Sequence, residues 1–254
     1  MFIERTNSTN TLMREMIAKG KWPEGECFLR TDFQTAGRGQ TGNRWESEEG
    51  KNLLCSILLP PRQNLFELNV ITSVAVHRMI SKLGISELTI KWPNDIYWRD
   101  KKVAGILIEN AIIGNEAKYS IAGIGLNINQ TEWLSQAPNP VSLKQIDGEA
   151  RKIEELMARL LQEIHQALKE DVWAYYKAHL YRKEGFWPFV EREVSLEPTM
   201  NVQRDEVQGI KDQGQGTKVF MARIADICPT GEIVLEDPKG ISKKYHFKEI
   251  RFVV

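Results

Sequence analysis

The polar run at residues 91–97, followed by the apolar run at 103–109, is the feature that most constrains how this chain can fold. Residues 87–90 predict a short strand, and the Trp-Pro-Asn-Asp sequence at 92–95 predicts a turn that ends it. Lys91 would then close a strand, where a rigid element can direct its ammonium group into a cleft. The alternative is an ordinary hairpin whose charges are solvated, and this motif alone leaves both open.

The part of the chain up to about Tyr181 alternates helical and extended patterns. Helices are expected at residues 9–19 and 65–83, each followed by glycine, and from Glu149, where apolar residues repeat at helical spacing. The long apolar stripe after Glu149 indicates core packing and not a site. Strands are expected at residues 27–33, 53–59, 89–91, 96–98, 103–109 and 119–127.

The pattern changes after about Tyr181. Short extended runs alternate there with turns that contain Gly, Pro and Asp, and the runs lie at residues 220–227, 233–235, 244–247 and 250–253. Several short strands separated by turns predict a small barrel. We therefore expect two domains, at residues 1–180 and 181–254.

Charge and cysteine content narrow the class of protein. The 254-residue chain carries 34 basic and 34 acidic residues, so it has no general attraction for nucleic acid or for an anionic membrane. Its three cysteines, Cys27, Cys55 and Cys228, show neither metal-ligand spacing nor a disulfide framework. The N-terminus lacks a signal-peptide pattern, and no apolar stretch is long enough to span a bilayer. We expect a cytoplasmic protein that binds neither DNA nor membranes.

Three more segments accompany the Lys91 motif, and they are Ser8-Thr9-Asn10, Gln34-Thr35-Ala36-Gly37-Arg38-Gly39 and Gly123-Ile124-Gly125-Leu126-Asn127-Ile128-Asn129. Together with Lys-Trp-Pro-Asn-Asp and Ala-Gly-Ile-Leu, they resemble the motifs of biotin–protein ligases, in the order that family requires. The likeness covers roughly residues 1–180 and continues more weakly to the C-terminus. Four ordered motifs in one chain are far more specific than one.

The resemblance implies an α+β fold. A mixed β-sheet would be flanked by helices, and a small C-terminal β-barrel would resemble an SH3 domain. Some members of this family also carry an N-terminal DNA-binding winged helix. Because only seven residues precede Ser8, we expect the short form without that module. The resemblance leaves a monomer and a homodimer open.

The resemblance also implies an activity, ATP-dependent biotin–protein ligation. Biotin would be activated as biotinyl-5′-AMP and then passed to one lysine of a biotin carboxyl carrier protein, with ATP and Mg²⁺ required. Bringing two anions together needs cations and directed N–H donors. The resemblance assigns Lys91 to the junction of the biotin carboxylate and the α-phosphate, and Arg38 to the phosphate or the carboxylate. These two are the expected catalytic residues.

The remaining site residues are implied by the same motifs. The resemblance assigns to biotin Ser8, Thr9, Asn10, Gln34, Arg38, Gly39, Gln40, Lys91, Gly105 and Gly123. It assigns to the nucleotide Arg38, Trp45, Asn94, Lys102 and Asn127. Asp95 is the candidate Mg²⁺ ligand.

Each motif also has a structural interpretation. Ser8 before a helix is a common N-cap, and residues 94–95 can simply form a turn. Asn10 can secure its own turn. The glycines of residues 37–42 can belong to an ordinary connection, and Gly123 can serve packing alone.

Three rival functions stay open. A lipoate or octanoate ligase or transferase shares the general fold, although Lys-Trp-Pro-Asn-Asp argues against it. The others are a DNA-binding regulator that only senses biotinyl-adenylate and a noncatalytic module that retains the pocket.

The glycine-rich loop departs from the family pattern, because Gln40 and Asn43 stand where relatives commonly carry arginine. Neutral Gln40 offers a phosphate no charge. We therefore expect an active enzyme that holds the adenylate less tightly.

Overall fold

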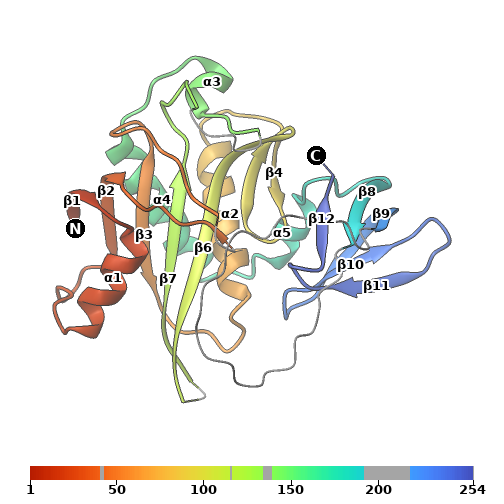
Figure 1. The fold of residues 1–254 in the computed structure, drawn as a ribbon, viewed down its shortest axis with the longest axis horizontal. Coiled ribbons are helices and arrows are strands. Elements are labelled where there is room, and N and C mark those ends of the chain that lie inside the picture. Colours follow the sequence, from red (N-terminus) through yellow and green to blue (C-terminus); the bar gives the residue numbers. More distant parts are fainter. Residues whose placement is uncertain (41–42, 115, 134–138, 192–217, 254) are drawn as a thin grey trace, which may run out of the picture. The chain divides into compact units, whose positions relative to one another are not determined.

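The computed structural model describes residues 1–40, 43–114, 116–133, 139–191 and 218–253. These residues form two compact units, Met1–Tyr181 and Arg182–Val254, and each unit has its own sheet (Figure 1). None of the helices in the described ranges is long and apolar enough to cross a membrane.

A mixed seven-stranded sheet forms the centre of the first unit, with strands in the order β1-β2-β3-β7-β6-β5-β4. β1 pairs with β2 in parallel, and the other neighbouring pairs are antiparallel. The mixed sheet implied by the resemblance is thereby confirmed. The strands are β1 Phe2–Thr6, β2 Phe28–Gln34, β3 Leu53–Leu59, β4 Leu88–Lys91, β5 Asp95–Trp98, β6 Lys101–Ile113 and β7 Glu116–Leu126.

Helices cover both faces of this sheet, as the continuous apolar sequence of β3 requires. Six of the seven β3 residues are buried, which is typical of a strand covered on two sides. Helix α1 (Thr9–Ala18) contacts β2, β3 and β7, whereas α4 (Ile153–Ala167) contacts β3 and packs on α2. Helix α2 (Glu67–Ser81) contacts β4, β5 and β6. Figure 1 shows α1 on the opposite face of the sheet from α2 and α4.

Three short elements of the first unit escaped the sequence analysis. β1 is an exposed edge strand with the sequence Phe-Ile-Glu-Arg-Thr, so it lacks the apolar alternation that marks a half-buried strand. Helix α3 (Leu143–Asp147) has only five residues and is stabilised by a capping box between Ser142 and Gln145. Helix α5 (Trp173–Ala178) has six residues. Elements this short depend on tertiary contacts more than on local pattern.

The second unit contains a five-stranded antiparallel sheet in the order β11-β10-β9-β8-β12. Phe189, Ile227 and Ile233 are fully buried in it. A small C-terminal β-barrel resembling an SH3 domain was expected. The antiparallel sheet agrees with that expectation, although the pairing of the described strands does not close a barrel. The strands are β8 Trp187–Glu191, β9 Lys218–Ile227, β10 Ile233–Glu236, β11 Ser242–Tyr245 and β12 Ile250–Phe252.

Candidate active site

Cross-strand register places four residues in one row on one face of the sheet. Lys91 pairs with Asp95, Asp95 with Gly105, and Gly105 with Gly125. Directly paired residues in antiparallel strands point to the same face. This row, called the glycine row below, thus sets a lysine and a carboxylate beside a floor that has no side chains.

Lys91 lies at the end of β4 among aromatic side chains. Its Nζ donates to Tyr97 Oη at 3.0 Å and lies 4.5 Å from the centroid of that ring. The Tyr181 ring is 5.7 Å from the same nitrogen. Burial raises the pKa of Tyr97, and the Asp95 carboxylate acts in the same direction, so the phenol is neutral at pH 7. Tyr97 therefore orients the ammonium group without neutralising its charge.

The indole of Trp45 covers the two glycines of the row. A Cβ added at Gly105 would lie 2.8 Å from Trp45 Cζ3, and one added at Gly125 would lie 2.7 Å from Trp45 Nε1. Such contacts leave no room for a side chain at either position. The indole N–H is buried and has no hydrogen-bond partner among the described residues. A buried donor without a partner, in a side chain that covers the floor, is what a site completed by a polar ligand would show.

Asp95 and Lys102 form an ion pair beside this floor. Lys102 Nζ lies 2.8 Å from Asp95 Oδ2 and 5.6 Å from the centroid of the Trp45 ring. Within the described ranges, no group of three or more His, Cys, Asp or Glu side chains could hold a metal ion. One carboxylate fits the way Mg²⁺ is bound by enzymes that take it with a nucleotide, because phosphate oxygens and water then supply its other ligands.

The glycine-rich segment forms a small hairpin above the sheet. Arg38 and Arg44 form an antiparallel bridge, and Gly39 N–H donates to Asn43 O at 2.7 Å. A Cβ on Gly37 would lie 2.6 Å from the carbonyl oxygen of Trp45, so this position requires glycine. Two members of the predicted loop, Thr41 and Gly42, lie outside the described residues.

Gln40 belongs to the same hairpin. Its Oε1 is buried and has no partner among the described residues. The Gln40 acceptor and the Trp45 donor are thus two buried polar groups of this segment that a ligand could engage.

The start of α1 meets the end of β2. Gln34 Oε1 accepts from Thr9 N at 2.8 Å and from Thr9 Oγ1 at 3.2 Å. Ser8 is at the N-cap position, but its side chain makes no capping hydrogen bond. The N-cap interpretation of Ser8 therefore holds for its position and lacks the usual bond.

Asn10 joins α1 to the sheet instead of securing its own turn. A Cβ on Gly123 would lie 2.5 Å from Asn10 Oδ1, so Gly123 makes room for this side chain. Asn10 Oδ1 accepts from Ser56 Oγ at 2.5 Å, and Asn10 Nδ2 donates to Glu109 Oε2 at 2.7 Å. The same Glu109 oxygen accepts from Arg38 Nη2 at 2.7 Å.

Glu109 and Ser56 were absent from the predicted site. Both lie inside strands whose sequences are largely apolar, and a single polar residue on a strand commonly faces solvent. The available signal was an acidic residue in β6 on the same side as Gly105, four positions away. Without the register of β6 and β7, that spacing does not identify its partners.

Asn94 and Asn127 contact the main chain in this structure. Asn94 Nδ2 donates to Ile106 O at 2.5 Å, and Asn127 Nδ2 donates to Val141 O at 3.2 Å and to Lys102 O at 3.3 Å. Both residues are 2% exposed. Buried amides bonded to carbonyl oxygens position the β5–β6 region, and a direct role toward the nucleotide stays a prediction.

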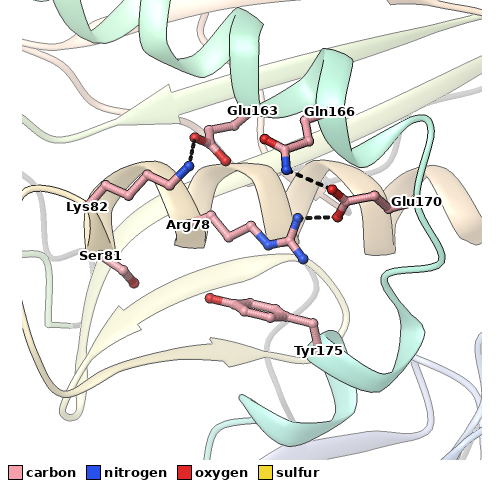
Figure 2. Close-up of a pocket in the computed structure, with 7 residues that line it drawn as sticks. All are labelled: Arg78, Ser81, Lys82, Glu163, Gln166, Glu170 and Tyr175. Atoms are coloured by element: carbon pink, nitrogen blue, oxygen red, sulfur yellow. Dashed lines mark hydrogen bonds and ion pairs between the residues drawn. The ribbon is translucent and has the colours of Figure 1, made fainter.

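A pocket of about 470 Å³ in the first unit is lined by residues of α2, α4 and α5 and of the segments that follow α2 and α4 (Figure 2). Arg78 contacts Glu170 at 2.7 Å, and Lys82 contacts Glu163 at 2.5 Å. These pairs join α2 to the segment that contains and follows α4. The pocket holds none of the predicted site residues, so we regard it as a helix-packing feature.

The sequence of this chain matches the sequence model of a known protein family. The biotin/lipoate A/B protein ligase family matches over residues 2–127. The bifunctional ligase/repressor BirA of Bacillus spizizenii is 30% identical over 239 residues, which cover 90% of this chain and 67% of that protein. The BirA of Escherichia coli is 28% identical over 200 residues, covering 77% of this chain and 58% of that protein. The chain thus spans roughly three fifths of these curated relatives.

Solved structures share the fold of this chain. The biotin protein ligase from Aquifex aeolicus in complex with biotin and ATP matches with a TM-score of 0.75 at 22% identity. That alignment covers 100% of this chain and 98% of the other.

Proposed function

Because the chain belongs to the biotin/lipoate A/B protein ligase family, we propose that it is an ATP-dependent biotin–protein ligase. The observation that carries this proposal is the glycine row. It puts the Lys91 ammonium group at the edge of a side-chain-free floor, under an indole with an unsatisfied donor. A floor without side chains, covered by an aromatic ring and lying beside a cation, suits a ligand that is part heterocycle and part anion.

In the first half-reaction, an oxygen of the biotin carboxylate attacks the α-phosphorus of ATP. An O–P bond forms, the bond to pyrophosphate breaks, and biotinyl-5′-AMP results. Two anionic groups must approach one another, so the barrier falls where fixed positive charge meets them. Lys91 supplies that charge from the strand end, and Arg38 supplies it from the loop.

In the second half-reaction, the amine of an acceptor lysine attacks the carbonyl carbon of the mixed anhydride. An amide bond forms, AMP leaves with the electron pair, and the amine loses a proton. The acceptor would be a biotin carboxyl carrier protein, in line with relatives named biotin–[acetyl-CoA-carboxylase] ligase. The reaction would take place in the cytoplasm, where ATP is abundant and the free cysteines Cys27, Cys55 and Cys228 would stay reduced.

The ligands would divide the site between them. The ureido ring of biotin needs matched donors and acceptors, which Ser8, Thr9 and Gln34 offer beside the α1 N-terminus. The nucleotide would take the part of the floor that the Trp45 indole covers in this structure, so the indole would have to move aside when the nucleotide binds. Mg²⁺ bound to its phosphates would use Asp95, and Lys102 would then turn from Asp95 to a phosphate oxygen. Mg²⁺ would screen the phosphate charge when bound.

We assign the second unit, which begins at Arg182, to ATP use or to docking of the acceptor. All the residues assigned to biotin and the nucleotide lie in the first unit. A chain truncated after Tyr181 should still bind biotin if it folds, but should biotinylate an acceptor poorly. Full ligase activity of the folded truncated chain would contradict this assignment.

The decisive experiment is incubation with MgATP, an acceptor carrier domain and labelled biotin, in parallel with labelled lipoate. Label on the carrier from biotin alone is the expected result. Label from lipoate alone would favour the rival ligase of the same family. Release of pyrophosphate without transfer would leave only the first half-reaction, and binding without pyrophosphate release would overturn the enzymatic proposal.

A further inference from the structure

Glu109 connects three parts of the candidate site through one carboxylate. Its Oε2 accepts from Arg38 of the glycine-rich hairpin and from Asn10 of α1, both at 2.7 Å. Its Oε1 accepts from Arg14 Nη1, one turn further along α1, at 3.3 Å. The Glu109 side chain is 23% exposed, so these charge-assisted bonds are partly shielded from water.

This arrangement keeps Arg38 away from the glycine row. Glu109 lies four residues along β6 from Gly105, which is about 13 Å in an extended strand. Lys91 belongs to the row of Gly105. The two cations assigned to one reacting junction are therefore held at separate levels of the sheet, and Arg38 carries a carboxylate partner of its own.

We propose that Glu109 competes with the anionic ligand for Arg38. Glu109 binds Arg38 in the ligand-free protein and releases it when a carboxylate or phosphate of the ligand arrives. This inference rests on the proposed function and names a positioning residue for it. A guanidinium group that already has a carboxylate partner attracts a second anion less than a free one. The charge on the ligand is what displaces Glu109.

Glu109 can release Arg38 because two other donors remain on it. Removing one partner from a shielded ion pair is costly when the other charge is left alone. Here Arg14 and Asn10 still hold the carboxylate after Arg38 leaves. The exchange therefore replaces one ion pair by another, and an anionic ligand gains from Arg38 only what remains after Glu109 is displaced.

The test compares biotin with biotin amide, in which a neutral carboxamide replaces the carboxylate. In Glu109→Gln, the affinity for biotin relative to the amide should rise about threefold to tenfold, because a negative charge near the ligand is lost. Arg14→Gln should act in the opposite direction, lowering that ratio about twofold to threefold, because Glu109 would then hold Arg38 more tightly. Arg14 is 48% exposed, so this variant keeps the inference testable even if Glu109→Gln does not fold.

Glu170→Gln is the matched control. Glu170 contacts Arg78 of α2 at 2.7 Å, the same distance as in the Arg38–Glu109 pair. The Arg78–Glu170 pair belongs to the pocket lined by α2, α4 and α5, away from the predicted site residues. The ratio of affinities should not change in this variant. An unchanged ratio in Glu109→Gln, or an equal change for both ligands, would show that Glu109 is merely structural.

Measurements on the wild-type protein distinguish failure of the role proposed for Glu109 from failure of the proposed function. Wild-type protein that binds biotin and releases pyrophosphate with MgATP, together with unmoved ratios in the variants, overturns the role of Glu109 alone. Wild-type protein that binds neither ligand overturns the proposed function and this inference with it.

Discussion

The strand end and the loop end of the candidate site hold their charges in different ways. At the strand end, Lys91 and Asp95 are fixed by the pairing of β4 with β5. At the loop end, Arg38 belongs to a hairpin held by its own main-chain bonds, and its guanidinium group is held by Glu109. The position of Lys91 is thus set by sheet register, which a ligand cannot change. The position of Arg38 depends on an ion pair that a ligand can replace.

Removing Lys91 should have the largest effect, because strand pairing fixes its position and Tyr97, which accepts its hydrogen bond, is neutral and does not offset its charge. Lys91→Ala should slow adenylate formation at least about a hundredfold, since losing a positioned charge donor typically costs ~2–4 kcal/mol of barrier. Pyrophosphate release measures this. Lys101→Ala, which removes an exposed lysine at the start of β6, is the control and should be near normal. Near-normal release in Lys91→Ala would remove the strand end from the chemistry.

The strand end also depends on a neutral histidine beneath it. His77 of α2 bonds to Leu88 O of β4 at 3.2 Å and to Tyr175 Oη at 3.0 Å. Burial lowers the pKa of His77 from 6.5 to about 4, and nearby His179 and Arg78 act in the same direction. The folded state therefore binds fewer protons than the unfolded chain between these pH values. The stability from neutral His77 is complete above about pH 6.5 and is lost as the pH falls toward 4.

Replacing His77 should remove that pH dependence. Between pH 7 and pH 4.5, urea denaturation should show that wild type loses up to about 3 kcal/mol more free energy of unfolding than His77→Gln. His165→Gln, at an exposed histidine of α4, should lose stability as wild type does. Parallel losses in wild type and His77→Gln would show that His77 does not titrate in this range.

Adding a methyl group at Gly105 should have a smaller effect, and the loss of stability should depend on whether the Trp45 indole is present. Gly105→Ala should destabilise the protein by about 1–3 kcal/mol, because the new Cβ meets the indole of Trp45. In a Trp45→Ala background, the same change should cost less than about 1 kcal/mol, so the double variant should lose less stability than the two single variants lose together. Equal costs in both backgrounds would mean that Trp45 does not lie on the row in solution.

The smallest effect is expected at the loop end. Gln40→Arg adds a charge where relatives commonly carry arginine, so it should slow the release of preformed biotinyl-adenylate by about threefold to tenfold. Rapid dilution into unlabelled biotin measures the release rate. Gln40→Met, with similar length and no charge, separates charge from packing and should not slow release. Unchanged or faster release in Gln40→Arg would contradict an electrostatic role for this position.

The same contrast explains how much the sequence could predict. The hairpin that carries Lys91 and Asp95 was predicted because it is local, with proline and Asn-Asp marking its turn. The strands of the glycine row were predicted by their apolar content. The pairing of Gly105 with Gly125 was not predicted, because register between strands is a long-range property.

The contacts between the glycine-rich hairpin and the sheet were even harder to predict from the sequence. Glu109 meets Arg38, 71 positions earlier in the chain, and Asn10, 99 positions earlier. No local pattern encodes such a meeting. Asn10 itself was matched to the biotin motif by resemblance, whereas its bonds to Ser56 and Glu109 appear only when α1 is docked on β7.

The ion pairs of the resting site have a consequence for how anions reach it. Arg38 and Arg14 lie against Glu109, and Lys102 lies against Asp95, each at hydrogen-bond distance. Two carboxylates face three cations here, so these pairs weaken the positive field of the site without cancelling it. The Lys91 ammonium group adds to that field, because its partner Tyr97 is neutral. We therefore expect the encounter rate of an anionic ligand to fall as salt is added, with the steering coming mainly from the strand end.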